Sequence, residues 1–547
     1  MLVRKTLVLL VALCALCFLV ACGGNGGTIT NPQPPPSGGF TDSQLNGTYV
    51  FSVSGTDENG APYSIAGTFT ANGSGTNSGG GITGGTLDIN DSDTSEFTTG
   101  PLAGVSVESG SSYGVSVDGR GQVSLQTNIG NGFPTLVFDF VLQDNSHGLI
   151  TEFDSFGSGS GTLDLQSSGV TPSGSYAFLL SGASYADSAW AAAGNFTYTG
   201  GTIAGLEDIN EGGVLNYNGE ALSGSFSVGP SSTPATTLVT SVFPSGMVFD
   251  VFAIDGSHFK MIEMDTNATL SGDAFSQSTA TLPTGSLAFT LSGLLGVSSS
   301  AVPFAGGGLM TNTSGAVSGT EDFAEGTTVS TSSGPFSGAF TAAGTGRYTL
   351  GSLATFVGGA SYAAYPSSGG LLLVEIDTAG VTSGAAFTQA SGAGFPADGY
   401  ALNLAGTNLG GSTGSAEEVD DIAEFTTAAS GTTVTGIVDE NYAPGASGPI
   451  FDQALSGTYT APSGGRGLIS ATAGNNSNST LNGGFGITFY TVDGTTFPFI
   501  ENDGGQVATG VFVLQSTSTA TPAIAKAHAM YVPHPIFHPH AGKMNRK

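Results

Sequence analysis

The chain has 547 residues, of which only 9% are charged, and its formal net charge at pH 7 is −31. A chain this acidic repels phosphate backbones, which excludes nucleic acid as an expected partner. Its three cysteines lie at positions 14, 17 and 22, so neither disulfides nor a cysteine metal site can hold the rest of the chain together.

The N-terminal segment has the pattern of a secretion signal. Arg4 and Lys5 precede an apolar run from Leu7 to Ala21. This run is too short, and its flanks are wrong, for a membrane-spanning helix of about 20 residues. Its end, Leu19-Val20-Ala21-Cys22, resembles the lipobox of bacterial lipoproteins. The resemblance implies that residues 1–21 are removed and that Cys22 becomes the acylated N-terminus.

Acylation of Cys22 implies a membrane anchor. In bacterial lipoproteins the thioether carries a diacylglycerol and the amine a third acyl chain, and about 0.8 kcal/mol per buried methylene makes such an anchor effectively permanent. Gly23 after the cysteine is similar to the outer-membrane sorting choice of enteric bacteria. We therefore expect a cell-envelope protein, lipid-anchored in the outer membrane, with a flexible Gly/Pro-rich tether at residues 22–42.

Four later segments share motifs at similar spacing. Each contains a Gly-x-x-Asp-x-Asn motif, with Ala324 replacing the Asn in the third, and each ends with Glu-x-Asp and a Gln 12 residues beyond that Asp. The glutamines are Gln166, Gln277, Gln389 and Gln515. Their spacing of 111, 112 and 126 residues far exceeds that of solenoid repeats, so each unit should own a core. The predicted modules are residues 43–168, 169–280, 281–391 and 392–517, followed by a basic, His/Pro-rich tail at 518–547.

Each module is predicted to be all-β. Tyr49, Phe51 and Val53 alternate with smaller residues, which is the period of a half-buried strand. About eight such segments per module favour an eight-stranded up-and-down barrel, and the alternative is an immunoglobulin-like β-sandwich. The opening Gly-x-Tyr strand resembles the first strand of lipocalin-like and avidin-like barrels.

The Glu-x-Asp pair is the best-marked candidate site. Its two carboxylates should share one strand face about 7 Å apart, a spacing that suits Ca²⁺ or acid–base roles in glycoside hydrolysis. The nearly cation-free chain keeps one basic residue per module, which favours a structural ion pair inside each module, with Ca²⁺ binding as the second interpretation. These residues are Glu152, Asp154, Glu263, Asp265, Glu375, Asp377, Glu501, Asp503, Arg120, Lys260, Arg347 and Arg466.

The histidines suggest less. His147 and His258 lie in apparent hairpin turns and are predicted to be exposed, and no His-based nucleophile recurs. In the tail, His534, His538 and His540 could bind a transition metal through neutral imidazoles. The Gly-x-x-Asp-x-Asn motif is predicted to cap the turn that ends its own strand.

No residue is predicted to be catalytic. The leading hypothesis is a non-enzymatic envelope protein whose modules form a spaced rod for adhesion, surface structure or binding of a glycan or protein ligand. The first alternative is a carrier with one small apolar ligand per barrel, which requires an apolar cavity. The second is a carbohydrate-active enzyme, which requires one module with carboxylates that the others lack.

Overall fold

The computed structural model describes residues 39–517 apart from segments within that range. The segments left out are 75–78, 94–99, 130–133, 171, 187, 229–234, 241–245, 278–279, 297–300, 331–332, 352–359, 369, 410–415, 444–448 and 475–483. Cys22, the first part of the tether, and the tail with His534, His538 and His540 therefore lie outside the described residues. Within the described residues no helix is long and apolar enough to cross a membrane.

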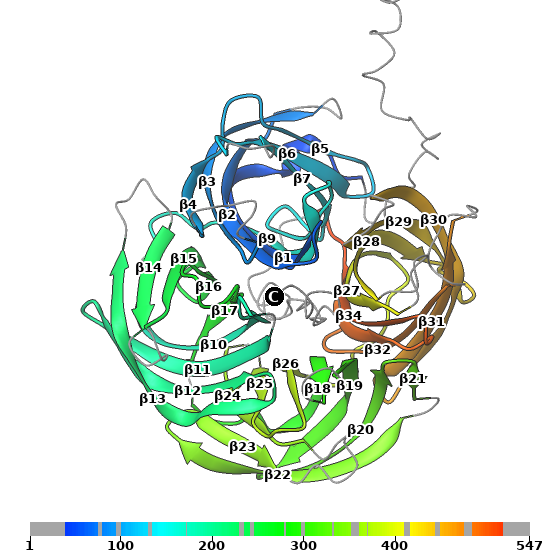
Figure 1. The fold of residues 1–547 in the computed structure, drawn as a ribbon. Coiled ribbons are helices and arrows are strands. Elements are labelled where there is room, and N and C mark those ends of the chain that lie inside the picture. Colours follow the sequence, from blue (N-terminus) through cyan, green and yellow to red (C-terminus); the bar gives the residue numbers. More distant parts are fainter. Residues whose placement is uncertain are drawn as a thin grey trace, which may run out of the picture. The chain divides into compact units, whose positions relative to one another are not determined.

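Modules 2 and 4 are closed eight-stranded antiparallel barrels whose strands follow chain order (Figure 1). Module 2 consists of β10 (Gly174–Ala183), β11 (Ala189–Thr199), β12 (Thr202–Glu211), β13 (Val214–Val228), β14 (Ala235–Thr240), β15 (Val248–Asp255), β16 (His258–Glu263) and β17 (Ser271–Ser276). Module 4 consists of β27 (Gly399–Asn408), β28 (Glu417–Thr427), β29 (Thr433–Ala443), β30 (Ile450–Ser463), β31 (Arg466–Ala473), β32 (Phe485–Tyr490), β33 (Thr496–Glu501) and β34 (Gln506–Leu514).

Modules 1 and 3 are nine-stranded antiparallel sheets with one additional pairing each, β2 with β3 and β19 with β20. Module 1 contains the 3-10 helix η1 (Asp42–Gln44), β1 (Asn46–Asp57), β2 (Pro62–Asn72), β3 (Gly80–Asp91), β4 (Leu102–Ser106), β5 (Ser112–Val115), β6 (Arg120–Gln126), β7 (Thr135–Leu142), β8 (His147–Glu152) and β9 (Gly157–Leu165). Module 3 contains β18 (Gly285–Leu295), β19 (Val302–Thr313), β20 (Ala316–Glu325), β21 (Thr328–Val329), β22 (Gly334–Gly344), β23 (Arg347–Gly351), β24 (Tyr362–Pro366), β25 (Gly370–Glu375) and β26 (Gly380–Thr388).

The predicted all-β tandem modules are confirmed, and so is the up-and-down barrel for modules 2 and 4. In module 2 the first strand pairs with the last, Phe178 opposite Ala274, so the sheet closes on itself and the sandwich alternative is wrong there. The alternation seen in the sequence directs every second side chain inward, as Tyr176, Phe178 and Leu180 do in β10.

Aromatic side chains pack inside the barrels. In module 4 the rings of Phe497 and Phe512 stack with centroids 4.9 Å apart, and Phe489 and Tyr400 contact the same pair. Phe40 is fully buried in the core of module 1. The end of the predicted tether therefore belongs to the first module.

The modules also share apolar cores with one another. One buried cluster combines Val141 of module 1, Leu179 of module 2, Tyr365 of module 3 and Tyr490 of module 4 with their neighbours. Side chains that face outward from one module are thus buried against another. The predicted spaced rod is wrong, because buried residues of all four modules pack together.

Candidate functional site: the module junctions

Arginine from one module binds the motif aspartate of the module before it. Arg347 Nη2 lies 2.5 Å from Asp208 Oδ1, and Arg466 Nη2 lies 2.7 Å from Asp322 Oδ1. Arg120 of module 1 binds Asp439 of module 4 at 3.0 Å, so the same contact joins the two ends of the repeat. The predicted pairing of these arginines with Glu-x-Asp inside one module is wrong. Each arginine faces outward from its own module and contacts the motif aspartate of the neighbouring module instead.

The motif aspartate is held by several donors. Asp208 is fully buried at a bulge in the β12–β13 pairing, where Gly219 N–H donates to Oδ1 at 2.8 Å. Tyr365 Oη donates to Asp208 Oδ2 at 2.5 Å, and Tyr490 donates to Asp322 in the same way at 2.9 Å. Although burial opposes the charge of Arg347, Asp208 holds the pKa of this guanidinium above its ordinary value. A buried ion pair is tolerated where additional hydrogen bonds satisfy it, as here.

The motif asparagine binds the loop that carries Glu-x-Asp in the next module. Asn210 Nδ2 donates to the carbonyls of Glu375 and Gly380 at 3.1 and 2.9 Å. Asn90 donates to the carbonyls of Glu263 and Ala268, both at 2.8 Å, and Asn441 to those of Glu152 and Gly157, both at 2.8 Å. The sequence predicts that these amides cap the turns of their own strands. This prediction is wrong, because they bind backbone carbonyls of the neighbouring module.

The repeated glutamine also reaches into the next module. Gln166 donates to the carbonyl of Ala253, Gln277 to Pro366, Gln389 to Thr491, and Gln515 to Asp118 and Leu142, all at 2.7 to 2.9 Å. Contacts therefore run from module 1 to 2, 2 to 3, 3 to 4, and 4 back to 1. They form a closed cycle, in which module 1 supplies the partner that a fifth repeat would have supplied.

The Glu-x-Asp aspartates cap turns of their own module. Asp154 accepts N–H groups from Val137 and Phe156, both at 2.7 Å. Corresponding backbone donors reach Asp265, Asp377 and Asp503. Such caps are structural, since they satisfy backbone donors that the strand pairing leaves open.

The glutamates of the pairs are fully buried. Burial raises the pKa of Glu375 to about 8, and it raises the pKa values of Glu152, Glu263 and Glu501 well above the ordinary range. Among the described residues no group of three or more His, Cys, Asp or Glu is arranged to hold a metal ion. Ca²⁺ binding by the Glu-x-Asp pairs stays a prediction.

Module 4 has two further inward carboxyls beside Glu501. Asp421 on β28 is paired directly with Glu440 on β29, whereas module 1 has Ile65 opposite Ile89 at the same place. Both oxygens of Asp421 and of Glu501 are buried without a hydrogen-bond donor among the described residues. Burial raises the pKa of Asp421 well above its ordinary value and that of Glu440 to about 7. Aligning the four modules on the motif Asn would have revealed this acidic pair.

The junction between modules 1 and 2 has a different chemistry. Lys260 is fully buried there, with Nζ 3.8 Å from Asp164 Oδ2 and 3.4 Å from Asp273 Oδ1. His147 lies 2.8 Å from Asp164, and His258 lies 2.6 Å from Asp273. The predicted contact of Lys260 with its own Glu-x-Asp and the predicted exposure of both histidines are therefore wrong. The sequence could not show that two hairpins from different modules meet.

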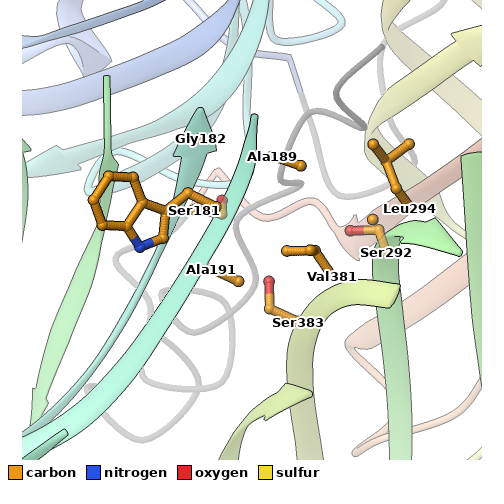
Figure 2. A pocket seen from close by; sticks show the side chains of 10 residues that line it. Ser181, Gly182, Ala189, Ala191, Ser292, Leu294, Val381 and Ser383 are labelled. Carbon is orange, nitrogen blue, oxygen red and sulfur yellow. The ribbon is translucent and has the colours of Figure 1, made fainter. Parts of the chain in front are cut away.

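Two cavities lie at the junctions between modules. Figure 2 shows Ser181, Ala189 and Ala191 of module 2 facing Ser292 and Ser383 of module 3. This cavity has a volume of about 20 Å³, which is room for one water molecule. A second cavity of about 560 Å³ lies between modules 3 and 4 and is lined by Ser286, Gln389, Gly465, Thr491 and their neighbours.

No family model matches the chain, and no curated protein matches it. Five solved chains are weakly similar, and two of them are an iron transporter and a siderophore receptor. The FrpB iron transporter of Neisseria meningitidis, in its F5-1 variant apoprotein form, has 10% identity and a TM-score of 0.13, with 87% of this chain and 83% of that chain covered. The siderophore receptor PirA of Pseudomonas aeruginosa has 10% identity and a TM-score of 0.11, with 85% and 79% covered. Similarities at these TM-scores carry no argument about fold or function.

Proposed function

We propose that this chain is a non-enzymatic, lipid-anchored protein of the cell envelope whose four β modules act as one rigid structural and binding unit. The observation that supports this proposal is the closed cycle of buried contacts between modules. Gln515 joins module 4 to module 1 through two hydrogen bonds, so every module touches two others. Linkers between modules held in this way cannot act as free hinges.

Rigidity suits a structural protein or a binding platform. A glycan or protein ligand that contacts several modules at once would find its sites already placed, which lowers the entropy cost of binding. Calorimetric unfolding of the full chain tests the rigid unit. We expect one cooperative transition, whereas separate transitions of single modules would contradict it.

Attachment to the outer membrane rests on the lipobox at Cys22. When the full chain is produced in a bacterial host with labelled palmitate, we expect the label in the protein and the protein in the detergent phase. Cys22→Ser should lose both. A wild-type protein that stays unlabelled and in the aqueous phase would show that the anchor is wrong.

The carrier alternative has less support. A lipocalin-like or avidin-like carrier needs an apolar void, and the interiors are packed with side chains such as Phe489, Phe497 and Phe512. The enzyme alternative requires one module with carboxylates that the other modules lack. Module 4 has Asp421 and Glu440, but both are fully buried, where a substrate would not reach them. A glycan and lipid binding screen on the full chain would separate the binding platform from the carrier.

A further inference from the structure

Three of the four junctions place a guanidinium on the motif aspartate, and the junction between modules 1 and 2 does not. Arg120 is the first residue of β6 and is paired with Val141. The equivalent residue of module 2 is Ala235, the first residue of β14, which is paired with Phe252. Module 2 therefore has no arginine to offer to Asp88, the motif aspartate of module 1.

Asp88 is nonetheless buried like its counterparts. Its side chain is 1% exposed, and Oδ1 accepts the N–H of Gly104 at 2.7 Å. Oδ2 is buried and has no hydrogen-bond donor among the described residues. One carboxylate oxygen of Asp88 thus lacks the kind of partner that Arg347 gives to Asp208.

A second carboxyl, that of Asp250 in module 2, faces Asp88 across the junction. Asp250 is paired with Thr237 in module 2, as Asp139 is paired with Gln122 in module 1. The two aspartates therefore occupy the same register position. Ala66, which pairs with Asp88, packs in one apolar cluster with Phe252, two residues beyond Asp250. Burial raises the pKa of Asp88 to about 8, and the charge of Asp250 adds to this rise.

No described atom fills the position beside Gly104 that corresponds to the place of the Arg347 guanidinium beside Gly219. Gly219 has a φ of 67°, and a Cβ added to it would lie 2.8 Å from Cζ of Arg347. Gly104 has nearly the same φ of 68°, and none of the described atoms lies within 4 Å of the corresponding Cβ position. The backbone beside Asp88 therefore has the same conformation as the backbone beside Asp208, but no arginine of module 2 occupies it.

We propose that Asp88 and Asp250 bind a small divalent cation, for which Ca²⁺ is the probe, in the place that arginine takes at the other junctions. Hard cations prefer carboxylate, carbonyl and water oxygens, and water would complete the coordination. A site with only two carboxylates belongs to the weak class of Ca²⁺ sites, with a Kd on the order of 10⁻⁴ to 10⁻³ M. Bound cation would join modules 1 and 2 as Arg347 joins modules 2 and 3.

Calorimetric titration of the full chain with CaCl₂ at pH 7 tests this site, with thermal unfolding with and without Ca²⁺ as a second readout. We expect saturable heat and a higher Tm with Ca²⁺. Asp88→Asn should weaken binding at least tenfold. Glu108→Gln, which removes an exposed carboxylate of the same module, should bind as wild type does.

Ala235→Arg keeps both carboxylates and supplies a guanidinium at the equivalent register position. We expect it to abolish Ca²⁺ binding and to make the Tm independent of Ca²⁺. This variant decides the question if Asp88→Asn fails to fold. The proposal is overturned if wild type gives no saturable heat, or if either junction variant binds Ca²⁺ as wild type does.

Discussion

Arg347 of module 3 forms a bidentate ion pair with Asp208 of module 2, through Nε to Oδ2 at 2.7 Å and Nη2 to Oδ1 at 2.5 Å. Arg347 is 4% exposed and Asp208 is fully buried. The same pair recurs between modules 3 and 4 as Arg466 with Asp322. In modules 2 and 3 the motif aspartate is therefore one half of an ion pair whose other half lies in the following module.

Replacement of Arg347 should destabilise the whole unit. Arg347→Ala leaves a buried carboxylate without its cation, which costs about 3–5 kcal/mol in the free energy of unfolding. Urea denaturation measures this loss. Arg466→Ala is the matched comparison and should cost less, because the Arg466 side chain is 24% exposed. An unchanged urea midpoint for Arg347→Ala would contradict a structural role for the pair.

Gln515 should stabilise the contact between modules 4 and 1. It is 1% exposed, and Gln515→Ala would leave the carbonyls of Asp118 and Leu142 without this donor. We expect a loss of about 1–3 kcal/mol and faster amide hydrogen exchange at this junction. Gln166→Ala removes a single bond from a half-buried side chain and should cost less. If the two substitutions lowered the free energy of unfolding equally, the contact of Gln515 with module 1 would not be more stabilising than that of Gln166 with module 2.

Asp452 should tolerate glycine. Asp452 has a φ of 53°, and its N–H donates to the motif aspartate Asp439. In modules 1 and 2 the equivalent residues are Gly104 and Gly219, whose N–H groups donate to the motif aspartates in the same way. Relief of the left-handed backbone is worth about 1 kcal/mol. The exposed ion pair with Arg120 that Asp452→Gly removes is worth about 0–1 kcal/mol. Thermal unfolding should therefore find a stability within about 1 kcal/mol of wild type.

Asp439→Ala is the contrasting variant at this junction. It removes the acceptor of both Arg120 and the Asp452 N–H, and the Asp439 side chain is 8% exposed. We expect a clearly lower Tm. A loss from Asp452→Gly as large as that from Asp439→Ala would contradict the weak role of the Asp452 side chain.

His147 should make the contact between modules 1 and 2 depend on pH. Burial favours the neutral ring, but the hydrogen bond and charge of Asp164, with the charges of Asp144 and Asp255, raise the pKa of His147 above its ordinary value. A histidine with a raised pKa contributes stability that is fully present below about pH 6.5 and is lost as pH rises through the folded-state pKa.

The pKa of Asp164 is lowered, mainly because the hydrogen bond from His147 and the charge of Lys260 outweigh burial. Its contribution is present above about pH 4 and is lost as pH falls through the lowered pKa. The stability difference between wild type and His147→Gln should thus be largest between about pH 4 and 6.5 and should shrink toward pH 9. Urea midpoints across this range measure it, and a difference independent of pH would rule out the titration of His147.

The inward carboxyls of module 4 should lower its stability at high pH. An acid whose folded-state pKa is raised binds protons more tightly when folded, so stability falls as pH rises from the unfolded pKa to the folded one. For Glu440, whose pKa is raised to about 7, this amounts to about 3 kcal/mol at pH 8. The double variant Asp421→Ala with Glu440→Ile copies the Ala192 and Ile209 pair of module 2.

This double variant should be more stable than wild type at pH 8, with a difference that narrows toward pH 4. Chemical denaturation at the two pH values measures it. Because Glu501 remains in the variant, a residual decline above pH 4 is expected. A variant less stable than wild type at pH 8 would show that the carboxyls have partners that stabilise them.

Much of the fold could be predicted from the sequence. The alternation in segments such as Tyr176 to Leu180 shows which face of each strand is buried, because a strand has a period of two. Four copies of one motif set at like spacing show four modules. These are local properties of the chain, and the structure agrees with them.

The partners of the motif residues could not be predicted. Asp, Asn and Gln side chains have the same hydrogen-bonding capacity whichever module supplies the other group. Gln515 binds the carbonyl of Asp118, 397 residues away, and only the packing of module 4 against module 1 brings them together. Lys260 of module 2 likewise lies near Asp164 of module 1 only because these two modules are in contact.

The sequence by itself determined the β modules, their number and the inward faces of their strands, because short-range patterns along the chain specify each of these, and it predicts a lipobox at Cys22. Only the tertiary structure decided that the outward motifs join modules in a closed cycle, and that Asp88 lacks the arginine that Asp208, Asp322 and Asp439 have. The physical reason is that a strand pattern specifies side-chain direction, whereas the partner of an outward polar group depends on which surface buries it.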